Sequence, residues 1–415
     1  MRRTAKPRPA PSVKPVEKVT VSTRYMGLRI AAVIVLVIVG AASLAYGFTS
    51  LFTGETGWTE IAANSAKGPS LAGNFVLLYD VQNSGEKRAV TALYTEAAEK
   101  AWQLFNNDQA TEGVPNIRYL NDHPNEAVTV DEGLYKALAE IVESGSRHVY
   151  LAAVARTYDN LFFCADDALT ADFDPLLNDD LRRSFGEIAA FARDKSAVRV
   201  EMLPDHQVCL KVSDAYLAYA EAEEINDFID LHWMLNAFAA DYIADRLMAQ
   251  GYTRGALSSA DGFARTLGAA SAETYSVNVY DGRSGAAVQA AVAQYPGAGS
   301  VVTLHSYPLS GESGERYYVR RDGQVRNRFL DVQDGLSRAA LPDLMLHSAG
   351  LGCGETLLRA IPFYIADTFD EAAALAAWGE AGIGAVWCRD HAVRYTDPKL
   401  TLYLAEGYTA ELAAD

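Results

Sequence analysis

Six aspartates between residues 166 and 180 form the densest group of side chains that could bind a ligand. They are Asp166, Asp167, Asp172, Asp174, Asp179 and Asp180. Several carboxylate oxygens close together could bind a hard cation such as Ca²⁺. Their spacing does not match an EF-hand loop, so the alternative interpretation is a solvated acidic loop.

Other residues with reactive side chains are scattered. The seven histidines occur singly, and the chain contains no G-x-S-x-G, H-E-x-x-H, P-loop or G-x-G-x-x-G motif. The four cysteines form no C-x-x-C pair, which excludes zinc-ribbon and thioredoxin motifs. One or two disulfides and free buried thiols remain as alternatives for them. They are Cys164, Cys209, Cys353 and Cys388.

The elements that would position such residues are a mixture of helices and strands. Apolar residues recur at helical spacing over 90–105, 130–142, 181–193, 230–250, 352–364 and 371–380. Strand patterns cover 74–81, 198–203, 207–212, 275–280, 300–304, 316–319, 385–388 and 391–395. Turn residues at 204–205, 322–323 and 389–390 predict hairpins. Because helices and strands do not alternate regularly, we expect an α+β fold.

One apolar segment indicates membrane attachment. Residues 30–54 carry no charged side chain, which is long enough for a helix to cross a bilayer. The first 29 residues hold eight Lys or Arg and one Glu, so the positive-inside rule places them in the cytoplasm. A cleaved signal peptide is the alternative. We favour a basic cytoplasmic tail (1–29), a single transmembrane helix (30–52), a linker (53–71) and an extracytoplasmic domain (72–415).

The charge of the chain excludes one class of partner. It carries 53 acidic and 36 basic residues, a net charge of −17, and eight of the basic residues lie in the N-terminal tail. A field of this sign repels the phosphates of nucleic acids. We therefore expect no nucleic-acid binding by the domain.

Several stretches resemble the FAD:protein FMN transferase (ApbE-like) family, over roughly residues 74–396. The segment 229–241 is similar to the family's I-D-L-G-G-I-A-K-G-Y-A-x-D, and Asp261-Gly262 falls near its G-G-D turn. Phe329-Leu330-Asp331 with Gly335 resembles H-I-I-D-P-x-T-G. The segment 144–152 occupies the place of T-G-A-F-D-x-T-x-G, and 352–357 that of A-D-A-L-S-T.

The resemblance implies a mixed α/β domain that binds FAD and Mg²⁺ outside the cytoplasmic membrane. Members of the family transfer FMN from FAD to a Thr or Ser of a partner protein. The cofactor-binding positions it implies are Tyr150, Asn236, Asp241, Asp261, Asp331 and Gly335. The metal-binding positions it implies are Glu355 and Thr356.

The matched motifs also depart from the family pattern. His232-Trp233 replaces Gly-Gly, and Asn236 replaces a lysine that would suit phosphate. Cys353 stands for a metal-binding Asp, and a thiol is a poor ligand for Mg²⁺. Glu355 or Thr356 could bind the metal only if the register slips. Tyr150 stands where the family has Thr.

Three hypotheses follow from these departures. The chain is a divergent transferase whose metal ligands are Glu355, Thr356 and Asp331, or it keeps the fold and binds a flavin or another ligand without catalysis. In the third, it is an anchored structural domain whose site is filled by Trp233 and Tyr150. We favour the second hypothesis and expect Asn236, Asp331 and Cys353 to surround one cleft.

Overall fold

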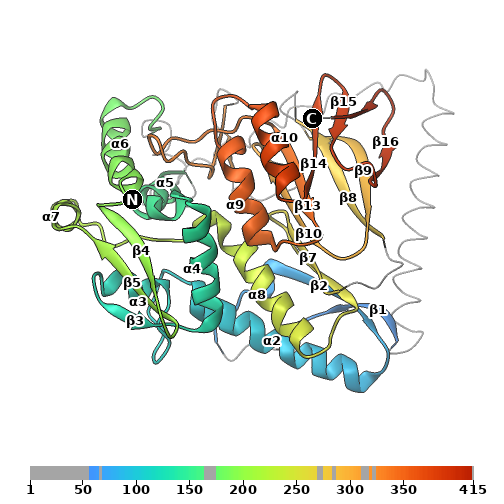
Figure 1. The fold of residues 1–415 in the computed structure, drawn as a ribbon, viewed down its shortest axis with the longest axis horizontal. Helices are drawn as coiled ribbons and strands as arrows, with labels where there is room; N and C mark the ends of the chain where they lie inside the picture. Colours follow the sequence, from blue (N-terminus) through green and yellow to red (C-terminus); the bar gives the residue numbers. More distant parts are fainter. Residues whose placement is uncertain are drawn as a thin grey trace, which may run out of the picture. The chain divides into compact units, whose positions relative to one another are not determined.

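A nine-stranded sheet organises the protein (Figure 1). The computed structural model describes residues 56–64, 68–162, 174–268, 274–282, 287–309, 317–319 and 324–413. Neighbouring strands are antiparallel except β15 and β17, which are parallel. In sheet order the strands are β1 (Gly57–Ile61), β2 (Phe75–Val81), β6 (Gly255–Ser259), β7 (Phe263–Thr266), β10 (Ser300–His305), β13 (Asp343–Ser348), β14 (Ile383–Arg389), β15 (Ala392–Tyr395) and β17 (Thr409–Leu412).

Helices cover one face of this sheet. Helices α2, α8, α9 and α10 pack against its strands and against one another, and their apolar side chains form the main core. The helices of the described residues are η1 (Ala72–Asn74), α2 (Ser84–Phe105), α3 (Ile117–Asp122), α4 (Glu132–Ser144), η2 (His148–Leu151), α5 (Ala152–Phe162), α6 (Asp179–Arg193), α7 (Asp214–Ala222), η3 (His232–Met234), α8 (Leu235–Ala249), α9 (Cys353–Tyr364) and α10 (Glu371–Glu380), where η denotes a 3₁₀ helix.

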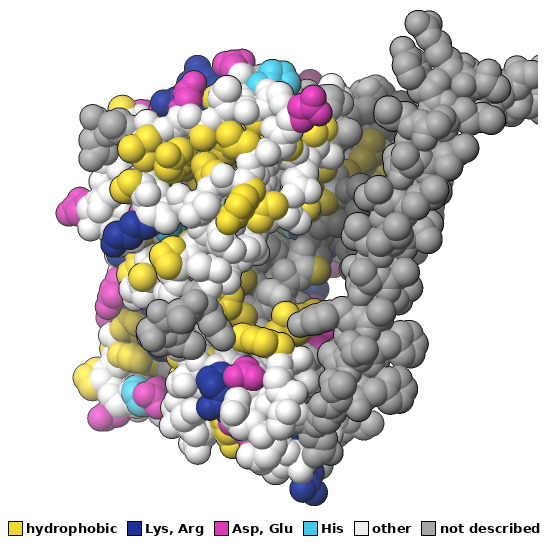
Figure 2. All heavy atoms as spheres, turned by 90° about the vertical axis from the view of Figure 1, so that its right-hand side faces the viewer, with side chains coloured by type: hydrophobic (Ala, Val, Ile, Leu, Met, Phe, Trp, Pro, Cys, Tyr) yellow, Lys and Arg dark blue, Asp and Glu magenta, His cyan; other side chains and the backbone are white. Residues whose placement is uncertain are grey.

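A second sheet packs beside β13 and β14 and shares a separate apolar cluster with them. It has the order β16 (Thr401–Leu404), β9 (Val288–Pro296) and β8 (Thr274–Asp281). Its exposed apolar side chains include Val288, Tyr403 and Leu404. Figure 2, which views the molecule from this side, shows apolar side chains interspersed with polar and backbone atoms.

Two small sheets complete the fold. One, of order β3 (Ala127–Thr129), β5 (Gln207–Val212) and β4 (Val198–Leu203), packs against α3 and α4. The other is the antiparallel pair β11 (Tyr317–Val319) and β12 (Val325–Asn327). The mixed α/β architecture confirms the fold class expected from the sequence.

Local sequence signals explain several element boundaries. Asn83 caps α2 by accepting a hydrogen bond from the Glu86 amide at 2.9 Å. Asp131 caps α4 in the same way, and Gly145 ends that helix in the left-handed region at φ 70°. Along β2, buried residues alternate with more exposed ones, as expected for a strand with one covered face.

Two expectations about element boundaries are wrong. The linker expected over 53–71 contains β1, which pairs with β2 and belongs to the main sheet, so the compact unit begins before residue 72. The helix expected from residue 230 begins later, because the Asp230 carboxylate accepts the His232 amide at 3.0 Å and His232 has φ 49°. The α-helix α8 then starts at Leu235.

The expected tail (1–29) and transmembrane helix (30–52) lie outside the described residues. Within the described ranges, every helix is too short or too polar to span a bilayer. Cys209 and Cys353 are buried free thiols, and Cys164 lies outside the described residues.

Candidate functional site

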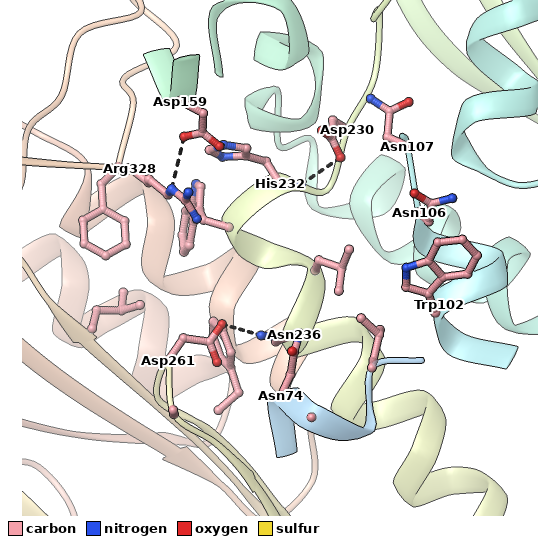
Figure 3. A pocket seen from close by; sticks show the side chains of 18 of the residues that line it. Asn74, Trp102, Asn106, Asn107, Asp159, Asp230, His232, Asn236, Asp261 and Arg328 are labelled. Carbon is pink, nitrogen blue, oxygen red and sulfur yellow. Dashed lines mark hydrogen bonds and ion pairs between the residues drawn. The ribbon is translucent and has the colours of Figure 1, made fainter. Parts of the chain in front are cut away.

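A cavity of about 570 Å³ opens beside the start of α8. Its walls come from η1, the end of α2, α5, η3, the β6–β7 turn, the end of β10 and the segment that follows β12 (Figure 3). We call it the Asn236 cavity. Pockets of roughly 300–1000 Å³ with apolar walls and a few polar groups are typical small-molecule sites.

An amide–carboxylate chain lines one side of the Asn236 cavity. Asn236 donates to Asp261 at 2.7 Å and accepts from Asn74 at 3.1 Å. The other carboxylate oxygen of Asp261, Oδ1, is buried and has no hydrogen-bond partner among the described residues. Because buried polar atoms are normally paired, this oxygen is suited to accept a hydrogen bond from a ligand.

The β6–β7 turn that carries Asp261 depends on a glycine. Gly262 has φ 99°, and a Cβ at this position would lie 2.1 Å from the carbonyl oxygen of Thr303. The Thr303 amide also donates to the Gly262 carbonyl at 2.8 Å. Only glycine allows this close approach, which fixes Asp261 at the cavity wall.

A cluster of two basic side chains around one carboxylate lines a different side (Figure 3). Asp159, on α5, lies 2.9 Å from Nε2 of His232 and 3.1 Å from Nε of Arg328. The neighbouring carboxylate, Asp230, is held in place by the His232 amide, and burial raises its pKa. This cluster contains the only Arg or Lys among the described residues that line the cavity.

Aromatic rings form the apolar part of the wall. Trp233 packs edge-on against Phe329 at a centroid distance of 4.9 Å, and Phe329 packs in the same manner on Tyr364. Trp102 lies at another side of the cavity (Figure 3). Trp233 is therefore part of a wall and leaves the cavity open, which disagrees with the hypothesis of a site filled by Trp233 and Tyr150.

A histidine–carboxylate pair stands at the end of β10. His305 and Asp343 face each other across β10 and β13, and Nδ1 of His305 lies 2.7 Å from Oδ1 of Asp343. Tyr307 donates to the same carboxylate oxygen at 2.5 Å. His305 also lines the cavity, and its ring packs edge-on against the rings of Tyr280 and Tyr307.

Three of the residues implied by the resemblance lie elsewhere. The Tyr150 hydroxyl accepts the Val200 amide at 2.9 Å inside the core, beside β4. Asp331 and Gly335 form a turn, in which the Gly335 amide donates to the Asp331 carbonyl at 2.7 Å and Gly335 has φ 76°. The Asp331 carboxylate forms an ion pair with Arg338 at 3.0 Å. None of the three lines the Asn236 cavity.

Asp241 stabilises the start of α9 from a neighbouring helix. Its two carboxylate oxygens accept the amides of Cys353 and Gly354, each at 2.8 Å, and Arg265 lies 3.3 Å away. Burial raises the pKa of Asp241 to about 6. Asp241 also lines a separate cavity of about 370 Å³, where burial and Asp241 raise the pKa of Glu140 to about 8.

The residues implied for Mg²⁺ do not fit a metal site. Thr356 is fully buried with its hydroxyl 3.1 Å from that of Ser300, and the Cys353 thiol donates to the Ala264 carbonyl at 3.2 Å. Glu355 is half-buried on α9. Over the described ranges, no three His, Cys, Asp or Glu side chains are placed to hold a metal. Mg²⁺ requires several oxygen ligands in a strict geometry, which these residues do not provide.

The structure thus brings together only part of the implied site. Asn236 and Asp261 share the cavity, whereas Asp331 and Cys353 do not line it, so the cleft expected around Asn236, Asp331 and Cys353 is wrong. No motif indicated Asp159 or the His305–Asp343 pair, because these contacts join distant segments.

Comparison with known proteins identifies the fold. No protein-family model and no curated protein matches the sequence. The crystal structure of the ApbE protein from Thermotoga maritima matches with a TM-score of 0.56 at 16% identity, covering 84% of this chain and 97% of that one. Flavin transferase ApbE from Vibrio cholerae matches with a TM-score of 0.54 at 13% identity, covering 85% and 98%.

A histidine-to-glycine mutant of the Vibrio cholerae protein matches with a TM-score of 0.51 at 14% identity, covering 86% of this chain and 99% of that one. The resemblance found in the sequence is therefore confirmed at the level of the fold. The chain has the mixed α/β fold of the ApbE flavin transferases.

Proposed function

We propose that this chain is an ApbE-like protein that binds a flavin nucleotide, FAD or FMN, in the Asn236 cavity. The observation that carries the proposal is an open cavity of about 570 Å³ with an aromatic wall and an unpaired acceptor, in a domain with the flavin transferase fold. A planar flavin ring would pack against Trp233 and Phe329. A ring N–H group would donate to Oδ1 of Asp261.

The direct test is calorimetric titration of the full-length protein with FAD and FMN. The proposal expects saturable binding that is weakened about tenfold or more by Asp261→Ala, since a lost bond to a charged acceptor costs roughly 1.5–3 kcal/mol. Asp205→Ala, in the exposed β4–β5 turn, is the matched control and should bind as the wild type does. Equal effects of both substitutions would contradict the assignment of the site.

We favour binding without FMN transfer. The support is that the implied metal ligands are engaged in protein contacts, with Thr356 bonded to Ser300 and Asp331 paired with Arg338. The expected result is an unchanged mass of a Thr-containing acceptor after prolonged incubation with FAD and Mg²⁺, beside an active transferase as positive control. A mass increase equal to FMN would overturn this part of the proposal.

The second candidate function is FMN transfer to a Thr or Ser of a partner protein, and the His305–Asp343 pair favours it. Nε2 of His305 would accept the proton of the attacking hydroxyl, whose oxygen bonds to the phosphorus on the FMN side. The bond from that phosphorus to the bridging oxygen breaks, and AMP leaves with its electron pair. Asp343 would stabilise the imidazolium that forms.

We also propose that residues 30–52 anchor the protein in the membrane and that the domain acts outside the cytoplasm on an exported partner. The support is the uncharged segment 30–54 and the basic excess before it. In intact cells, a membrane-impermeant protease should degrade the domain while the tail stays protected. Protection of the domain in intact cells, with digestion after lysis, would contradict this topology.

A further inference from the structure

The residues implied for a metal ion lie outside the Asn236 cavity. The donor set that would hold Mg²⁺ is dispersed, because Thr356 is fully buried against Ser300 and Asp331 belongs to a turn with Arg338. The phosphates of a flavin nucleotide need positive charge nearby. Another group in this chain must therefore supply it if such a ligand binds.

Arg328 is placed to supply that charge. Its side chain lines the Asn236 cavity directly after β12, and its Nε lies 3.1 Å from the Asp159 carboxylate. Asp159 is shared with His232, so this one carboxylate holds two basic side chains at the cavity wall. The next residue, Phe329, packs between Trp233 and Tyr364, which restrains the backbone that carries Arg328.

The carboxylates of the cavity differ in whether a basic side chain is paired with them. Asp261 and Asn236 lie at a separate part of the wall from the Asp159–His232–Arg328 cluster (Figure 3). Asp261 forms no ion pair with a described residue, so it would repel an anionic phosphate and attract a ring N–H donor. The cluster also holds carboxylates, Asp159 and Asp230, but Asp159 is paired with both Arg328 and His232. Guanidinium groups bind phosphate oxygens through paired N–H donors.

We propose that Arg328 binds the phosphate groups of the flavin nucleotide, so that binding does not require a divalent cation. The inference rests on the proposed flavin-binding function and assigns the orientation of the ligand. The phosphates lie at the Asp159–His232–Arg328 cluster, and the N–H edge of the ring lies at Asp261.

The test compares FAD with riboflavin, which lacks phosphate, by calorimetry on the full-length protein. Each ligand is titrated in EDTA and in millimolar Mg²⁺. We expect the affinity for FAD to be the same in both buffers within about twofold. Arg328→Gln should weaken FAD binding about tenfold or more, the usual effect of losing a bond between charged groups, and leave riboflavin binding unchanged.

Two further variants control for misfolding and for general charge effects. Arg328→Lys keeps a positive charge and should retain more FAD affinity than Arg328→Gln. Arg183→Gln removes an exposed arginine paired with Asp180 on α6 and should bind both ligands as the wild type does.

The possible results separate the two proposals. Loss of FAD binding in EDTA, or equal weakening of FAD and riboflavin by Arg328→Gln, would overturn the role of Arg328 while leaving flavin binding established. Failure of the wild type to bind either ligand in either buffer would overturn the proposed function and the inference together.

Discussion

The start of α9 depends on a carboxylate from another helix, which leads to a quantitative prediction. The N-cap residue of α9, Gly352, offers no side chain, and Asp241 of α8 supplies the acceptors instead. A Cβ on Gly352 would lie 2.4 Å from the Asp241 carboxylate, which shows how closely the two segments pack. Asp241→Ala would leave the amides of Cys353 and Gly354 buried without acceptors.

The magnitude follows from two opposing effects. A buried polar group left unpaired costs about 1–3 kcal/mol, and two amides and Arg265 lose their partner. The substitution also removes a buried carboxylate whose own burial raises its pKa to about 6. We therefore expect the free energy of unfolding to fall by about 2–3 kcal/mol, at or below the lower end of the summed cost of roughly 3–9 kcal/mol.

Urea denaturation at neutral pH measures this difference. The matched control is Asp370→Ala at the exposed N-cap of α10, where the side chain accepts the Ala373 amide at 3.1 Å and the loss should be about 1 kcal/mol. Asp241→Asn should cost less than Asp241→Ala, because an amide oxygen still accepts one bond. If Asp241→Ala costs no more than Asp370→Ala, the role assigned to Asp241 is refuted.

Three further predictions concern the site and its surroundings. Gly262→Ala should lower both the melting temperature and the flavin affinity, because a Cβ would displace the turn that carries Asp261. The control is Gly186→Ala in α6, where a Cβ meets open space and should stabilise the protein by roughly 0.5–1 kcal/mol. Equal melting temperatures for the two variants would contradict the tight turn at Gly262. Burial and Asp241 raise the pKa of Glu140 to about 8, so the stability from its bound proton is present below an unfolded pKa near 4.5 and is lost as pH rises through 8. The melting temperature of Glu140→Gln should therefore rise relative to that of the wild type as pH increases from 5 to 9. A constant difference in melting temperature over this range would contradict the raised pKa of Glu140. If the protein transfers FMN, His305→Gln should lower the rate constant of transfer about 100-fold or more with little effect on FAD affinity. Mass spectrometry of the acceptor measures this rate, and an unchanged rate would contradict the role of His305 as a general base.

Local patterns predicted several elements because their signals are contained within short segments. The β4–β5 hairpin has the expected strands, Val198–Leu203 and Gln207–Val212, and α10 has the expected bounds, Glu371–Glu380. In both cases the periodicity and the flanking turn or cap residues suffice. The Gly- and Thr-containing sequence of β1 has only a weak strand pattern and resembles a linker, whereas its pairing with β2 decides its structure.

Site residues could be predicted only at positions that match a motif of the family. Asn236 and Asp261 were expected from their motif positions, and the structure joins them through a hydrogen bond. The pairing of His305 with Asp343 depends on the register of β10 and β13, and that of His232 with Asp159 on the packing of α5 beside η3. Neither register nor helix packing can be read from the sequence of one segment.

The central claim is that a flavin nucleotide occupies the Asn236 cavity, and a crystal structure of the protein soaked with FAD would test it most directly. We expect the flavin ring against Trp233, a ring N–H group on Asp261, and the phosphates beside Arg328. Flavin density at another surface, or an Asn236 cavity that excludes FAD at saturating concentration, would contradict the claim.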